Sequence, residues 1–231
     1  GETFALIEDD LTRAESLVTE DNGVTRINRD VITALEARIA AYRQDYGRVA
    51  TLSQQLIDKY PLANRAEYEA MFLDNSDGEV IFKLERTNND SYDGQGATGS
   101  AFAGGWAGAR FAFVDATLAG SPYFEFGRSL FNLIDEADIR YDVMVAPSSI
   151  IDPDYQNSPG SESNDILIIQ KYPGSEGQPL MNDLKIFRAS EMYLLRAEAY
   201  GANNQLDQAA QLLKEIRDAR FGTNTLLPAF S

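Results

Sequence analysis

Aromatic and glycine residues are interspersed between Thr87 and Gly127, a stretch without a regular apolar period. Flat aromatic faces can stack on sugar rings, and glycines let a ligand approach the backbone closely. Long irregular segments are usually functional or disordered, and this aromatic content argues against disorder. We therefore predict Trp106, Tyr92 and Tyr123 as candidate ligand-binding residues. The alternative is that these rings only pack the segment onto the rest of the protein.

Acidic side chains gather in two other places, from Asp135 to Asp142 and from Asp152 to Asp154. Carboxylates at close spacing can hold Ca²⁺, but neither cluster has the EF-hand pattern. Paired carboxylates can also hydrolyse a glycoside, yet no sequence spacing identifies such a pair. A solvated surface, or an ion pair such as that of Asp138 with Arg140, is the favoured interpretation. We predict no metal site and no catalytic site here.

A third charged group consists of Arg188, Glu191, Arg196 and Glu198. Arg188 and Glu191 are three positions apart, so they would share one face of a helix. This pattern is typical of a structural set of ion pairs. We predict that these residues stabilise the fold and do not contact a ligand.

The 231-residue sequence contains neither histidine nor cysteine. This excludes Ser-His-Asp triads, Cys-His dyads, histidine metal sites and disulfides. Only carboxylate chemistry would remain for an enzyme, so we predict a non-enzymatic protein without a cofactor. The formal net charge of −16 disfavours binding to nucleic acid or to anionic lipid.

Two pairs of helices are expected to form the scaffold. Between Leu184 and Arg220, apolar residues recur at helical spacing on both sides of a break at residues 202–205. Five of these residues have the spacing of a tetratricopeptide-type helix pair, namely Tyr193, Ala197, Tyr200, Ala209 and Leu213. The segment from Leu35 to Asp58 matches this pair in an alignment 160 residues earlier. A simple array would repeat at roughly 34 residues, so a long insert separates the two pairs.

Shorter patterns complete the fold prediction. Residues 3–18 predict an amphipathic helix, whose apolar face would consist of Phe4, Ile7, Leu11, Ala14 and Val18. Residues 79–85 and 166–169 read as short strands that could pair. Residues 129–137 predict a short helix, and residues 138–147 look extended.

We predict a mainly α fold in one domain over residues 1–231. Helix pairs at about 3–60 and 184–220 would form a tetratricopeptide-like superhelical bundle. An irregular insert at about 74–183 would carry a small β-hairpin or sheet.

Five motifs in sequence order resemble those of the SusD/RagB family of outer-membrane nutrient-binding lipoproteins of Bacteroidetes. Residues 187–199 resemble the family signature RxxExxLxxAEA. Residues 7–14 resemble its IxxDLxxA helix, and residues 34–42 resemble its ALxARxxLY helix. Residues 79–82 resemble its EVIF strand, and residues 138–140 its DxR. The resemblance covers nearly the whole chain, which is about half of a usual family member.

The resemblance implies a non-catalytic protein at the surface of the outer membrane. Such a protein would bind glycan or another nutrient and deliver it to a TonB-dependent transporter. Its only membrane attachment would be a lipid anchor, in a segment that this chain does not contain. The alternative is a tetratricopeptide-like adaptor whose groove binds a peptide.

Overall fold

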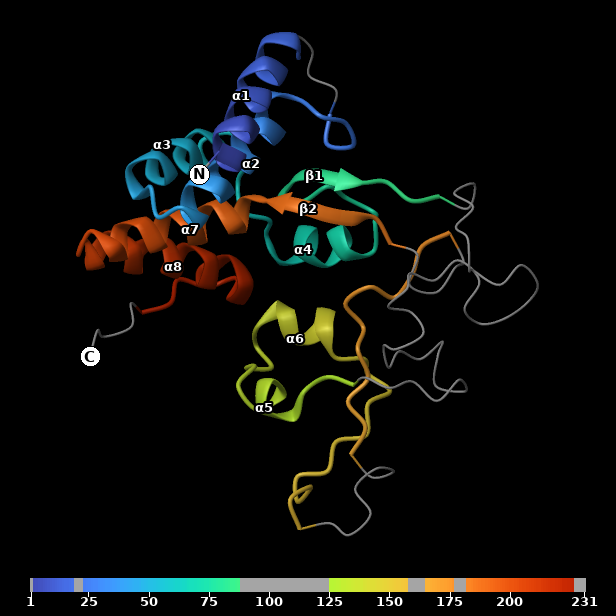
Figure 1. Cartoon of the computed structure of the whole chain (residues 1–231). Coiled ribbons are helices and arrows are strands. Elements are labelled where there is room, and N and C mark those ends of the chain that lie inside the picture. Colours follow the sequence, from blue (N-terminus) through green and yellow to red (C-terminus); the bar gives the residue numbers. More distant parts are fainter. Residues whose placement is uncertain (1, 19–22, 88–124, 158–164, 177–181, 227–231) are drawn as a thin grey trace. The chain divides into compact units, whose positions relative to one another are not determined.

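The computed structural model describes residues 2–18, 23–87, 125–157, 165–176 and 182–226 (Figure 1). Within these residues, eight helices and a two-stranded sheet form two units. Unit 1 comprises residues 1–71, 77–85 and 184–231, and unit 2 comprises residues 72–76 and 86–183. The prediction of a mainly helical fold with a small sheet is confirmed.

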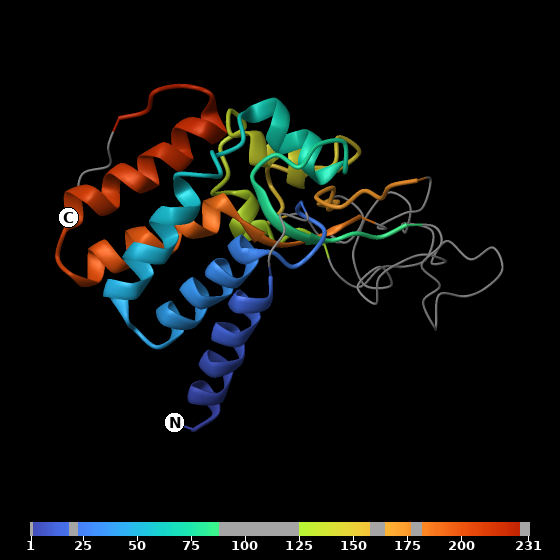
Figure 2. The same ribbon diagram turned by 90° about the horizontal axis from the view of Figure 1, so that it is seen from above.

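Four helices of unit 1 pack side by side (Figures 1 and 2). They are α2 (Arg29–Tyr42), α3 (Tyr46–Ile57), α7 (Ala189–Ala202) and α8 (Leu206–Phe221). α3 lies between α2 and α7, and α7 packs in turn against α8. The two predicted helix pairs, far apart in the sequence, therefore share one bundle. Among the described residues, no helix combines the length and the apolar character that crossing a membrane requires.

The two helical hairpins turn in the same way. Gln44 (φ 62°) and Asn204 (φ 57°), which lie 160 positions apart, both adopt the left-handed conformation. The next residue in each turn donates its backbone N–H to a carbonyl five positions back, Asp45 to Ala40 at 2.9 Å and Gln205 to Tyr200 at 2.8 Å. These bonds satisfy carbonyls that the end of a helix leaves free. The hairpins thus repeat in backbone geometry as well as in sequence.

Small and apolar side chains fill the core between these helices and the sheet. Ala34 and Ala37 of α2 are buried against Leu56, Met192 and Phe187. Ala40, Val49 and Ala199 form a second buried cluster. Alanines at these positions let the helix axes approach closely, which explains their spacing in the sequence.

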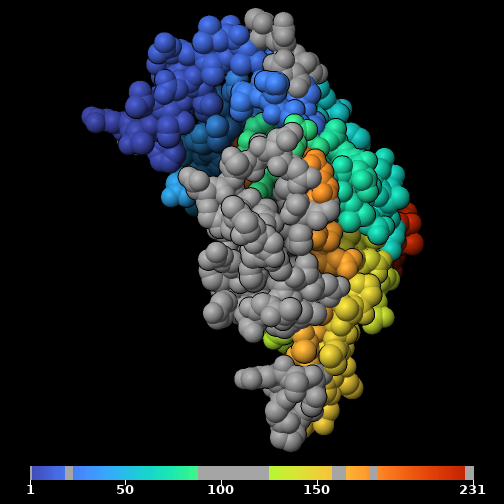
Figure 3. Space-filling view, turned by 90° about the vertical axis from the view of Figure 1, so that its right-hand side faces the viewer, coloured from blue at the N-terminus to red at the C-terminus, as the bar shows by residue number. Residues whose placement is uncertain are grey.

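α1 (Glu2–Leu17) packs against α2 and buries none of its residues fully. The ring of Phe4 lies 6.1 Å from the ring of Tyr42, centroid to centroid. Leu11 and Ala14 of the predicted apolar face are also partly covered, whereas Ile7 is exposed. The outer side of α1, dark blue in Figure 3, is open in the space-filling view.

The sheet pairs β1 (Val80–Leu84) with β2 (Leu184–Arg188) in an antiparallel register that places Leu84 opposite Leu184. Two predictions are wrong here. Residues 184–188 form a strand rather than the first turn of a helix, and residues 166–169 do not pair with β1. Residues 184–188 are strand because their backbone completes the ladder of β1. The following helix starts where the Ala189 N–H donates to the Glu79 carbonyl oxygen at 2.8 Å.

Short elements make up the rest of the described chain. α4 (Arg65–Phe72) precedes β1, and unit 2 contains α5 (Arg128–Phe131) and α6 (Ile139–Met144). In unit 2, residues 166 and 169 form isolated bridges to Ile150 and Val145. The prediction that residues 138–147 are extended is wrong over α6. Asp138 caps that helix by accepting the Arg140 N–H at 2.9 Å, which favours a helical start.

Ala197 of α7 and Ala209 of α8 lie at the helix crossing, with exposed fractions of 6% and 8%. We expect Ala197→Leu or Ala209→Leu to lower the free energy of unfolding by about 1–3 kcal/mol, because the larger side chain overpacks the interface. Urea unfolding followed by circular dichroism would measure this. Ala202→Leu, at an exposed position of α7, is the control. Wild-type stability of both core variants would show that neither alanine is at a tight crossing.

Candidate functional site

Trp106, Tyr92 and Tyr123, the predicted ligand-binding residues, lie in residues 88–124, outside the described residues. The structure describes how the chain is held on both sides of that segment. Before it, the Arg86 N–H donates to the Asp183 carboxylate at 2.8 Å. After it, the backbone of buried Phe126 donates to the Leu167 carbonyl oxygen at 2.9 Å. Both ends are therefore attached to unit 2.

A polar clamp, formed by the half-buried Asp74 and the buried Asn182 and Asp183, supports the first of these attachments. The Asp74 carboxylate accepts the Asn182 side-chain amide at 2.8 Å and the Asp183 N–H at 3.1 Å. Asn182 also accepts the Gly174 N–H at 2.7 Å and donates to the Phe72 carbonyl oxygen at 3.2 Å. Buried polar groups that are satisfied in this way specify one local arrangement. The clamp fixes the base of the insert in unit 2.

Arg128, at the start of α5, organises a second part of unit 2. Its guanidinium lies 4.2 Å from the ring centroid of Tyr155 and 4.9 Å from that of Phe131. It donates to the Asp165 carboxylate at 2.8 Å and to the Asp152 carbonyl oxygen at 3.1 Å. We call these residues, together with Asn132 and Gln156, the Tyr155 cluster. The cluster joins α5 to two loops that are distant in the sequence.

Amide groups surround the hydroxyl of Tyr155. The side chains of Asn132 and Gln156 donate to this hydroxyl at 3.3 Å and 3.2 Å. Both amide side chains are exposed, and Tyr155 is half-buried. A fixed aromatic ring beside amide groups can stack on a flat apolar face and hydrogen-bond the hydroxyls around it. No sequence pattern predicted this cluster, because Tyr155 follows an acidic, proline-containing loop rather than a periodic segment.

The acidic clusters are held by local contacts. Asp138 is buried and receives two hydrogen bonds from the Arg140 guanidinium at its Oδ2, of 2.9 Å and 2.5 Å, so the predicted ion pair is confirmed. Asp152 accepts the Asp154 N–H at 2.8 Å, which makes a turn. Burial raises the pKa of Tyr141, and the nearby charges of Glu136 and Asp142 raise it further. In the part of the chain that the structure describes, no three acidic residues gather as a metal site would require.

A buried ion pair that no sequence pattern predicted lies in unit 1. Glu79 receives hydrogen bonds from the Arg220 guanidinium at 2.9 Å and 2.8 Å. It also accepts the Ala63 N–H at 3.1 Å, and Arg188 lies 3.4 Å away. In the sequence, the one sign of this pair is Glu79, a charged residue directly before an apolar strand. The pair connects α8, the segment before α4, and the sheet, so its role is structural.

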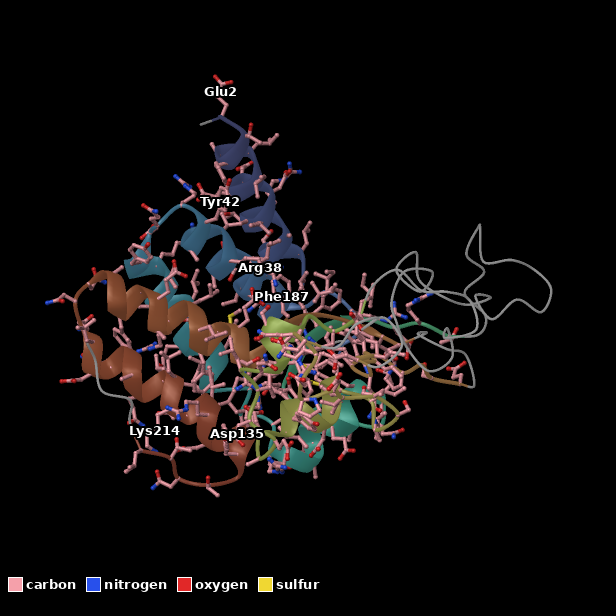
Figure 4. All side chains as sticks on the ribbon, turned by 90° about the horizontal axis from the view of Figure 1, so that it is seen from below. Glu2, Arg38, Tyr42, Asp135, Phe187 and Lys214 are labelled. Carbon is pink, nitrogen blue, oxygen red and sulfur yellow. The ribbon has the colours of Figure 1, made fainter. Side chains whose placement is uncertain are left out.

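The other charged residues of the signature also pair with distant elements. Glu191 of α7 forms an ion pair with Arg38 of α2 at 2.7 Å, and Arg38 stacks on Phe187 at 4.1 Å from the ring centroid (Figure 4). Arg196 donates to the Ala50 carbonyl oxygen at 2.7 Å. Arg188 ends β2, so the prediction that Arg188 and Glu191 share a helix face is wrong. The signature residues hold helices and sheet together across long sequence separations.

A model of the SusD family matches residues 50–229. No curated protein matches the sequence. Similar solved structures come from Bacteroides species. A SusD superfamily protein from Bacteroides thetaiotaomicron is 22% identical with a TM-score of 0.71, and the alignment covers 95% of this chain and 47% of that protein.

Two further similar structures are those of a carbohydrate-binding and a glycan-binding protein. A SusD-like carbohydrate binding protein from Bacteroides vulgatus is 22% identical with a TM-score of 0.67, over 100% of this chain and 45% of that protein. Surface glycan-binding protein A from Bacteroides fluxus is 20% identical with a TM-score of 0.60, over 90% of this chain and 47% of that protein. The chain spans about half the length of these proteins, and the likeness shows a shared fold.

Proposed function

The chain belongs to the SusD family, and on this basis we propose that it binds glycan or another nutrient at the cell surface without catalysing a reaction. The observation that carries the proposal is the family match over residues 50–229. Two proteins with the same fold, a carbohydrate-binding and a glycan-binding protein, support it. The absence of histidine and cysteine from the sequence agrees with a binding role rather than an enzymatic one.

In this proposal the two units have different tasks. Unit 1 is a tetratricopeptide-like scaffold, because its two hairpins share turn geometry and pack through α3 and α7. The insert in unit 2 presents the ligand, through Trp106, Tyr92 and Tyr123. The clamp of Asp74, Asn182 and Asp183 supports this division, since it holds the base of the insert in one arrangement.

We further propose that the protein delivers its ligand to a TonB-dependent outer-membrane transporter. The SusD/RagB resemblance of the sequence motifs supports this partner. The protein would be held at the outer membrane by a lipid anchor. Co-purification of the transporter with the tagged full-length protein from membranes is the test, and its loss at detergent concentrations that leave the transporter folded would count against a stable complex.

A second candidate function is that of a peptide-binding adaptor. The observation that favours it is the repeated hairpin geometry of α2–α3 and α7–α8. The number of repeats counts against it. Stacked repeats need about three copies to bury a continuous core, and the described residues provide two hairpins. Binding that maps to these four helices would favour the adaptor over the glycan-binding protein.

Affinity gel electrophoresis in polysaccharide-containing gels tests the predicted aromatic site. Retention here means the slowing of the protein by the polysaccharide, from which a dissociation constant is obtained. We expect at least one of Trp106→Ala, Tyr92→Ala and Tyr123→Ala to raise this constant about fivefold or more, since removal of a stacking ring at a binding hot spot costs over about 1 kcal/mol. Circular dichroism should show unchanged helix content. Undiminished retention of all three variants, with retention of the wild type, would exclude these residues as the site.

A further inference from the structure

The O–H group of Tyr155 can donate a hydrogen bond to a ligand. It accepts N–H groups from Asn132 and Gln156, and among the described residues its own proton has no acceptor. The side-chain oxygens of Asn132 and Gln156 likewise accept no hydrogen bond within the described ranges. One O–H donor therefore lies beside two amide acceptors. Neighbouring hydroxyl groups of a sugar, each of which both donates and accepts, complement this set.

The ring of Tyr155 is fixed before any ligand arrives. The guanidinium of Arg128 stacks on it at 4.2 Å from the ring centroid, and the ion pair of Arg128 with Asp165 at 2.8 Å holds the guanidinium in turn. The side chains of Arg128 and Asp165 are largely buried. A ring held in one orientation loses little conformational freedom on binding, which favours affinity. The half-buried Tyr155 ring thus has the rigidity of a stacking platform.

The charge around the cluster indicates the class of sugar. Asp165 neutralises Arg128, so the cluster offers no free cation to an acidic group. Unit 2 carries fifteen acidic and five basic residues in its sequence. The negative net charge that results repels uronic acids and sulfated sugars. The available groups at the Tyr155 cluster are one hydroxyl and two neutral amides, which suit uncharged sugars.

We propose that Tyr155, with Asn132 and Gln156, forms a subsite for a neutral sugar in unit 2. This inference rests on the proposed function and adds a location and a substrate class to it. The Tyr155 ring stacks on the apolar face of the sugar, and the tyrosine hydroxyl and the amide oxygens bind its hydroxyl groups. Its three residues all lie within the described part of the chain, and the subsite includes none of Trp106, Tyr92 and Tyr123.

The test compares variants of the full chain in gels that contain one polysaccharide each. Neutral probes are amylopectin, xylan, galactomannan and β-glucan, and anionic probes are polygalacturonate and chondroitin sulfate. We expect retention by at least one neutral probe and by neither anionic probe. Tyr155→Ala should weaken retention about tenfold, and Tyr155→Phe and Gln156→Ala should weaken it by a smaller factor. Retention of the wild type should be insensitive to salt, because no ion pair forms with the sugar.

Tyr42→Ala is the matched control, since Tyr42 is an 81% exposed tyrosine of unit 1. Its retention should equal that of the wild type. If Tyr155→Ala unfolds, Tyr155→Phe and Gln156→Ala decide, because both keep the local packing. Neutral-probe retention that is equal in the wild type and all Tyr155 and Gln156 variants overturns the subsite alone. Retention only by anionic probes overturns the substrate class. No retention by any probe overturns the subsite together with the glycan-binding form of the proposed function.

Discussion

Replacing Glu79 by glutamine should lower the free energy of unfolding by about 3–5 kcal/mol, the usual cost of breaking a buried ion pair by removing one partner. The two side chains of the pair are almost fully buried, with exposed fractions of 0% for Glu79 and 2% for Arg220. The guanidinium of Arg220 also stacks on Tyr68 at 4.1 Å from the ring centroid. Glutamine keeps the shape of glutamate but leaves the charge of Arg220 buried without its counter-charge.

Glu8→Gln is the control for this variant. Glu8 forms ion pairs with Arg43 at 2.5 Å and Arg48 at 3.2 Å, but its side chain is substantially exposed. Ion pairs at the surface contribute about 0–1 kcal/mol, so this variant should lose little stability. Urea unfolding compares the two. A Glu79→Gln protein that is as stable as Glu8→Gln would contradict a structural role for the pair.

The double variant Glu79→Gln, Arg220→Met separates charge from shape. It removes both charges, so it should recover much of the stability that the single Glu79→Gln change loses. Coupling between the two positions is measured as a double-mutant cycle with Arg220→Met alone. Additive losses would show that Glu79 and Arg220 act independently.

Met192→Ala should lower the free energy of unfolding by about 2–5 kcal/mol. Met192 has an exposed fraction of 0% and packs in the main core with Phe187, Leu56 and Ile81. Alanine would leave a cavity between the helices and the sheet. Several elements line this cavity, so the surrounding side chains can relax into it only partly. The measurement is the shift in the midpoint of urea unfolding, with the slope m of the free energy against urea concentration unchanged.

Leu194→Ala provides the comparison on the same helix, because Leu194 is 49% exposed. Its loss should be well below that of Met192→Ala, since the leucine side chain is already partly in water. Equal losses in the two variants would mean that the interior of α7 does not face the core as described.

The helices of unit 1 could be predicted because their information is local. Apolar spacing predicted α1, α7 and α8, and the match to the α7–α8 segment predicted α2 and α3. The small residues Ala197 and Ala209 marked a helix crossing, and both are buried. The α6 helix was also locally encoded, by the Asp138 cap, but its six residues are too few to show a helical apolar period. The capping residue is therefore the local signal for this helix.

The remaining features depend on residues that meet only after folding. Residues 184–188 become a strand because β1, about a hundred residues earlier, supplies a ladder for them. Arg220 and Glu79 are 141 positions apart, so no spacing rule connects them. The Tyr155 cluster joins Arg128, Asn132, Tyr155 and Asp165, which the chain brings together through two loops. Such contacts follow from tertiary topology rather than from periodicity.

Hydrogen exchange with mass spectrometry is the most direct test of the central claim that unit 1 is a scaffold and unit 2 binds sugar. The full chain is compared with and without saturating oligosaccharide from the neutral polysaccharide that retains it in gels. We predict slower exchange in peptides of unit 2, including residues 128–132 and 150–157, and unchanged exchange in α2, α3, α7 and α8. Slower exchange confined to those four helices, or no change anywhere in the chain, would contradict the account.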